Sequence, residues 1–179
     1  AFYNEQLSEN IPFKNLKKDS SKIKWSSTLE SFYKRGEKIN FDEDEFYIAS
    51  FKPFIKTNLY RETKLVHRIS KMKKIFPKNK QKNLAIGISG VGSRSEFSVL
   101  MTDVTSSMDC LEKSQYFPLY LYEEDMHESN QKNLFSVFNK KEIKKPAISK
   151  NIVDLFSKSH PNLNLTYEDI FYFIYAVLH

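Results

Sequence analysis

The stretch of sequence that decides the fold is NLAIGISGVGSRSEFSVLMTD, residues 83–103. It contains an apolar run at residues 84–88, a loop of small residues at 89–95 and a second apolar run at 97–101. Short apolar runs separated by Gly and Ser predict two strands joined by a loop. We therefore expect a β-sheet in the middle of this chain.

Further strands are predicted on both sides of this stretch. The aromatic run at residues 117–122 predicts a strand, and Pro118 places it at a sheet edge or at its own beginning. Alternating apolar residues at 46–51 predict another strand, which Pro53 should end in an irregular turn.

Three helices are predicted from apolar spacing and capping residues. The first covers residues 26–35, and the second covers 150–160, where Pro161 ends it. The third, residues 167–178, begins after the N-cap Thr166 and is apolar on all sides, so we expect it to be buried.

These elements predict a mixed α+β fold, with a central, mostly antiparallel sheet at residues 46–122 and a helical C-terminal segment. A length of 179 residues suits one domain, or one domain with a small appendage. We divide the chain into an N-terminal arm or connector (1–21), an α+β core (22–149) and a helical segment packed on that core (150–179).

Composition excludes several classes of protein. Apolar residues make up 40% of the chain and aromatic residues 15%, which is too much for a disordered protein. No run approaches the roughly 18 apolar residues of a membrane span, so we expect a cytoplasmic protein. A single cysteine, Cys110, excludes an internal disulfide, and with four scattered histidines it gives no zinc-binding spacing.

Positive charge is concentrated in residues 51–82, which hold 11 basic residues and one acidic residue, while the whole chain has a net charge of +6. Phe51, Phe54, Tyr60 and His67 lie among these cations. A field of this strength attracts polyanions, and nucleic acid is the obvious candidate. The alternative is a solvated, lysine-rich connector, and charge alone does not separate the two.

The glycines of the central loop do not form a nucleotide-binding signature. Gly87, Gly90 and Gly92 fit neither GxGxxG nor GxxxxGK[ST]. Two interpretations stay open: a hairpin turn that needs positive φ, or a loop whose Ser and Arg side chains meet phosphate or base edges.

No catalytic arrangement is visible in the sequence. None of the histidines has a Ser or Cys with an orienting carboxylate near it, and Cys110 is interpreted as a structural thiol. The acidic runs at 42–45 and 123–125 could bind a divalent cation, but such loops are more often solvated. We therefore predict no catalytic residue, no metal site and no cofactor in this chain.

Several segments in order resemble a known family. Residues 50–60, SFKPFIKTNLY, are similar to the Y-R-P-F-x-x-R-x-L-Y segment in the C-terminal specificity region of single-chain Type ISP restriction-modification enzymes. The C-terminal segment, residues 167–179, is similar to the D-I-F-Y-Y-V-Y-x-x-L-H ending of that family. Further matches between these two segments occur at residues 75–77, 83–86, 92–93, 97–103, 115–120 and 151–152. The resemblance runs from about residue 22 to the end.

The resemblance implies a function. Members of that family join a nuclease, a helicase-type ATPase, an adenine-N6 methyltransferase and, last, a target recognition domain, and this chain resembles only the last part. ATP, Mg²⁺ and S-adenosylmethionine would then be needed only by the upstream domains. Two departures stand out: Thr57 replaces a frequent Arg, and residues 105–109 replace the usual I-P-D-L-H.

We predict that the chain reads a DNA sequence in the duplex and presents it to methyltransferase and helicase domains. Basic side chains would hold phosphates, and side chains able to reach groove edges would read bases. The predicted phosphate contacts are Lys52, Lys56, Arg61, Lys64, Arg68, Lys71, Lys73 and Lys74. The predicted base contacts are Asn58, Ser93, Arg94 and Ser95.

Two other classes of function compete with this reading of the sequence. A docking module would attach to a methyltransferase or helicase through the terminal helix and the aromatic strand, with DNA contact incidental; it should leave an exposed apolar patch. An independent hydrolase using Asp103 or Asp109 would need a base, a metal set or a nucleophile, and the sequence shows none.

Overall fold

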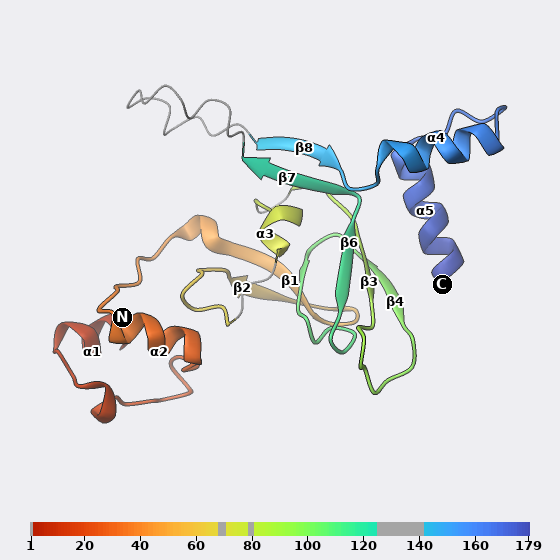
Figure 1. The fold of residues 1–179 in the computed structure, drawn as a ribbon. Coiled ribbons are helices and arrows are strands. Elements are labelled where there is room, and N and C mark those ends of the chain that lie inside the picture. The colour runs from red at the N-terminus through yellow and green to blue at the C-terminus, as the bar shows by residue number, and fades with distance from the viewer. Residues whose placement is uncertain (1, 68–70, 79–80, 125–141) are drawn as a thin grey trace, which may run out of the picture. The chain divides into compact units, whose positions relative to one another are not determined.

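The computed structural model describes residues 2–67, 71–78, 81–124 and 142–179 (Figure 1). Helices and strands are mixed along the chain, which confirms the α+β class. The chain divides into two compact units: unit 1 comprises Ala1–Tyr47 and Leu59–Ser70, and unit 2 comprises Ile48–Asn58 and Lys71–His179.

Unit 1 is built around the helices α1 (Phe2–Ser8) and α2 (Ser27–Lys34). The helix α2 confirms the first predicted helix. Ser26 caps it, because its hydroxyl accepts a hydrogen bond from the Leu29 amide at 3.2 Å. Gly36 ends this segment with a φ of 71°. Two 3₁₀ turns, η1 (Phe13–Asn15) and η2 (Glu43–Glu45), also belong to this unit.

The helix α1 contributes to the core of unit 1. Tyr3 of α1 packs with Leu29 and Tyr33 of α2 in one buried cluster. The Tyr33 hydroxyl donates to the Gln6 carbonyl at 2.9 Å. The expected arm or connector thus contributes side chains to this buried cluster, while the division of the chain at residue 21 stays a prediction.

The first sheet has the strand order β2-β1-β5, with β1 at Phe46–Lys52, β2 at Ile55–Tyr60 and β5 at Thr105–Ser106. β1 and β5 are parallel, with Ala49 opposite Thr105. The irregular turn expected after Pro53 is instead a tight two-residue connection, Pro53 and Phe54, that starts a strand absent from the sequence prediction.

The second sheet has the order β4-β3-β6 and lies within unit 2 (Figure 1). β3 (Ala85–Ile88) pairs antiparallel with β4 (Val99–Thr102) and with β6 (Gln115–Pro118). The predicted pair of strands around the glycine loop is confirmed. Gly87 lies opposite Tyr116, and a Cβ on it would lie 2.7 Å from a ring carbon of that tyrosine.

The aromatic run at 117–122 is split between two sheets. β6 ends at Pro118, while β7 (Tyr120–Glu124) pairs antiparallel with β8 (Glu142–Pro146). Leu119 between them is buried. The Asn83 amide group donates to the Tyr120 carbonyl at 2.9 Å and accepts from the Tyr120 amide at 3.2 Å, which fixes the bend. The expected single sheet is therefore three small sheets.

Three helices belong to unit 2: α3 (Met72–Ile75), α4 (Lys150–Ser159) and α5 (Tyr167–Leu178). Phe171 of α5 packs with Ile86 and Leu119 in one core cluster, and the side chain of Asp169 completes a capping box with Thr166. None of the described helices is long and apolar enough to cross a membrane.

The prediction that the last helix is buried is wrong. Within α5 only Ile170 and Phe171 are buried, whereas Phe173 is 53% exposed and Val177 is 68% exposed. The helix is apolar on all sides, but unit 2 covers only one of them.

Gly87→Ala should destabilise the chain by about 1 to 3 kcal/mol, because the added methyl group would overlap the Tyr116 ring. The measurement is the free energy of unfolding from urea titration, in the wild-type and in a Tyr116→Leu background. Gly87→Ala should cost less free energy of unfolding in the Tyr116→Leu background than in the wild type, because the ring is absent there. Equal costs in the two backgrounds would contradict this explanation of Gly87.

Candidate nucleic-acid interface

The β1–β2 hairpin carries two of the predicted phosphate contacts, Lys52 and Lys56, on exposed positions of unit 2. The Lys52 amino group donates to the Asp109 carbonyl at 2.9 Å. Lys56 pairs with the Asp103 carboxylate at 3.0 Å. Both partners are exposed, so these contacts are weak and can be exchanged for a phosphate oxygen. Asn58, a predicted base contact, is exposed further along β2.

The other three predicted base contacts are gathered on one carboxylate. The Oε2 atom of Glu112 accepts hydrogen bonds from the amides of Arg94 and Ser95 at 3.1 Å. It also accepts from the hydroxyls of Ser93 at 3.1 Å and Ser95 at 2.9 Å. These hydrogen bonds, that of the Ser95 hydroxyl foremost, lower the pKa of Glu112 to about 2.

Two loops are held together around this carboxylate, namely residues 89–98 and 107–114. The Gly90 amide donates to the Glu112 carbonyl at 3.2 Å, and the Lys113 amino group donates to the Gly92 carbonyl at 2.6 Å. A Cβ on Gly90 would overlap the Lys113 carbonyl oxygen, and Gly92 has a φ of 79°. Gly90 therefore permits the close approach of the Lys113 backbone, and Gly92 permits a positive φ.

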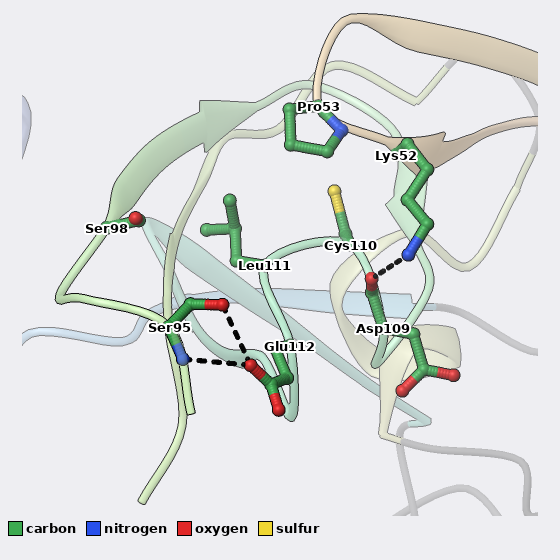
Figure 2. A pocket seen from close by; sticks show the side chains of 8 residues that line it. All are labelled: Lys52, Pro53, Ser95, Ser98, Asp109, Cys110, Leu111 and Glu112. Carbon is green, nitrogen blue, oxygen red and sulfur yellow. Dashed lines mark hydrogen bonds between the residues drawn. The ribbon is translucent and has the colours of Figure 1, made fainter. Parts of the chain in front are cut away.

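The hairpin and the two loops line one pocket of about 620 Å³ (Figure 2). Lys52 and Pro53 come from the hairpin, and Ser95 comes from the β3–β4 loop. The structure thus brings one predicted phosphate contact and one predicted base contact to the same hollow. The remaining lining residues are Ser98, Asp109, Cys110, Leu111 and Glu112.

Arg94 projects from this assembly. Its side chain is 95% exposed, and its Nε atom lies 3.6 Å from Glu112 Oε1. The backbone amide of the same residue is fixed by the other oxygen of that carboxylate. Arg94 therefore combines a fixed backbone with an exposed guanidinium.

Arg61 does not reach the surface. The residue is 2% exposed, and its guanidinium carbon lies 3.6 Å from the centre of the Tyr47 ring. Burial lowers the pKa of Arg61, and Tyr47 and Glu45 oppose that shift. Arg61 is therefore withdrawn from the predicted phosphate contacts, because its charge is enclosed within unit 1.

The remaining predicted phosphate contacts are divided between the units. Lys64 belongs to unit 1, where its side chain is 25% exposed and lies 3.5 Å from Glu37. Lys71 and Lys74 are exposed in unit 2, and Lys73 beside them is partly buried. Arg68 lies outside the described residues.

The acidic runs have structural roles among the described residues. Asp42 caps the following 3₁₀ turn by accepting from the Asp44 amide at 2.9 Å. Glu123 pairs with Lys145 at 2.6 Å. Within the described ranges, no group of three or more His, Cys, Asp or Glu side chains could hold a metal ion.

Sequence reasoning missed Glu112 as an organising residue. It lies 17 to 19 residues beyond the serines and the arginine that it binds, and its own φ of 58° is unusual for a glutamate. A lone Glu next to Lys113 carries no local pattern that would reveal these contacts.

Glu112→Gln should remove an acid-sensitive part of the stability. Because the pKa of Glu112 is lowered from 4.5 to about 2, its stabilising effect is present above pH 4.5 and is lost as the pH falls toward 2. The gap in unfolding temperature between wild type and Glu112→Gln should therefore shrink over this range. Glu96→Gln, which removes an exposed carboxylate from the same loop, is the control. A gap that stays constant from pH 6 to pH 2 would contradict the prediction.

Three solved structures with a similar fold are complexes with DNA or with a DNA substrate mimic. The chain resembles the ATP-dependent Type ISP restriction-modification enzyme LlaBIII bound to DNA, with 26% identity and a TM-score of 0.75 over 99% of this chain and 11% of that one. It resembles the DrdV–DNA complex at 26% identity and a TM-score of 0.80, over 99% of this chain and 16% of that one.

A third similar structure is a nuclease-deletion mutant of the Type ISP enzyme LlaGI in complex with a DNA substrate mimic. It has 26% identity and a TM-score of 0.72, over 99% of this chain and 12% of that one. The chain thus spans about one tenth to one sixth of the length of these enzymes. No curated protein sequence matches it.

The family comparison covers the whole sequence. Residues 1–179 match the family described as the Type ISP C-terminal specificity domain, which extends the resemblance noted from residue 22 onward to the N-terminal end. This chain belongs to the Type ISP C-terminal specificity domain family.

Proposed function

We propose that this chain binds duplex DNA and selects a target sequence for a restriction-modification enzyme. The observation that carries the proposal is the match of all 179 residues to the specificity-domain family, whose fold recurs in Type ISP enzymes bound to DNA. The geometry of unit 2 supports it, because the pocket joins a cationic hairpin to a loop of polar side chains.

Phosphate contacts in this proposal come from exposed lysines. Lys52 and Lys56 exchange their weak contacts with Asp109 and Asp103 for phosphate oxygens, which sets affinity and register. Lys71 and Lys74 add positive charge in the same unit, and Lys64 adds charge in unit 1.

Base reading in this proposal centres on Arg94. A guanidinium can donate two hydrogen bonds to O6 and N7 of guanine, and Glu112 supports Arg94 by holding its amide. Asn58 offers an amide to adenine, while Ser95 donates to a base edge only by leaving Glu112.

The chain itself carries out no bond-breaking step in this proposal. Nuclease, ATPase and methyltransferase chemistry, with ATP, Mg²⁺ and S-adenosylmethionine, belongs to other domains of the enzyme. A cytoplasmic location follows from the same assignment, since the DNA substrate is there.

A second role for α5 is favoured by its exposed apolar face. Its exposed apolar side chains include Phe173, Ile174 and Val177. Large exposed apolar patches usually mark interaction sites. We propose that this face docks on the methyltransferase domain of the same enzyme. Docking and DNA reading then use different parts of unit 2.

Arg94→Ala should relax the preference at one base pair at a cost of about 1 to 3 kcal/mol, because a bidentate contact is lost. Lys52→Ala with Lys56→Ala should instead weaken binding to all duplexes alike. Each lost phosphate contact should reduce the slope of log K against log salt by about 0.9. Binding of a randomised duplex pool, followed by sequencing, measures the first effect, and salt titration measures the second. An unchanged sequence preference in Arg94→Ala would remove that residue from base reading.

Phe173→Lys with Val177→Lys should weaken association with a separately produced Type ISP methyltransferase domain by at least about tenfold, or about 1.4 kcal/mol. Analytical ultracentrifugation measures the association. Leu163→Lys, a change of the same kind at an exposed position outside α5, should leave it unchanged. If the wild-type chain does not associate, docking through α5 is wrong and DNA reading is unaffected.

A further inference from the structure

The turn between β1 and β2 places a phenylalanine where a glycine would fit best. The turn consists of Pro53 and Phe54, and Phe54 has a φ of 64°. Proline fixes a negative φ, so the turn combines negative and positive φ, as in a type II turn. The second central position of such a turn favours Gly, and a bulky residue there is strained.

The side chain of Phe54 is also exposed. At 90% it has the highest exposed fraction among the large hydrophobic residues of the described chain. Positive φ and exposure are both unfavourable for Phe, and glycine at this position would avoid both. Folding therefore does not explain Phe54.

The base of the turn is held firmly within unit 2. The Ser107 amide donates to the Ser50 carbonyl at 3.0 Å, and the Ser50 hydroxyl donates to the Lys52 carbonyl at 3.1 Å. Phe54 is thus presented from a fixed support.

The tip joins an apolar ring to flanking cations. Lys52 and Lys56 are each two residues from Phe54, and all three side chains are exposed. Proteins that kink DNA insert apolar side chains between base steps while cations hold the adjacent phosphates. An exposed aromatic side chain flanked in sequence by two exposed lysines matches that chemistry.

Resting on the proposed function, we infer that Phe54 is a wedge that inserts between stacked base pairs of the bound duplex. Stacking of the Phe54 ring on bases offsets the unfavourable positive φ and the exposure of this side chain in the unbound protein. Steps that unstack easily, such as TA and CA, are then favoured without any hydrogen bond to them. The tip therefore contributes to target choice by a route separate from Arg94.

The test begins with a duplex selected by the wild-type chain from a randomised pool. Binding constants are then measured for Phe54→Gly, Phe54→Ala and Phe54→Leu, with Phe117→Ala as a control at an exposed phenylalanine of unit 2 outside the hairpin and the two loops. Permanganate reactivity of thymines reports unstacking at the contacted step.

The wedge predicts opposite effects of Phe54→Gly on folding and binding. Its unfolding temperature should rise, because glycine accepts the positive φ, while its DNA affinity should fall by about 5- to 100-fold, the loss of one stacking contact. Phe54→Ala should abolish the reactive thymine, Phe54→Leu should retain part of it, and Phe117→Ala should bind like wild type.

The possible failures are distinguishable. If wild type binds the duplex but Phe54→Ala binds equally well with the same thymine reactivity, the wedge is wrong and the proposed function stands. If wild type binds no duplex at low salt, the proposed function fails with it. Phe54-dependent binding to phosphatidylserine vesicles in place of duplex would assign the tip to a membrane surface and overturn the inference.

Discussion

The arrangement of the candidate site depends on one carboxylate between two loops. Glu112 collects the amides of Arg94 and Ser95 and the hydroxyls of Ser93 and Ser95, and its own carbonyl accepts from Gly90. Hydrogen bonds to a charged acceptor are stronger than neutral ones, so this contact is a firm link between distant segments. Without this carboxylate, the backbone amide of Arg94 in the β3–β4 loop would lose the hydrogen bond that fixes it.

The sequence predicts local elements better than it predicts partners. The strands around the glycine loop and the capped helix at Ser26 follow from patterns within a few residues. The environment of Arg61 depends on Tyr47 and Glu45, which lie 14 and 16 residues away, so a count of basic residues could not show its burial. The exposure of α5 was missed for a similar reason, because an apolar sequence does not say how many neighbours will cover it.

The β1–β2 hairpin shows where local sequence rules fail in this chain. Pro53 follows the end of β1, but the turn it starts leads straight into a second strand, with Phe54 at a position that favours glycine. Residues that conflict with local preference mark strain that something other than folding must offset. The hairpin and the two loops held by Glu112 line one pocket. Lys52, Arg94 and Phe54 all belong to unit 2.

Hydrogen–deuterium exchange of the chain, free and bound to a selected duplex, tests the central claim most directly. If unit 2 reads DNA through the hairpin and the β3–β4 loop, bound duplex should protect amides at residues 52–56 and 89–98, with little change in α5. Protection confined to α5 or to unit 1, with the hairpin and loop unchanged, would contradict the account.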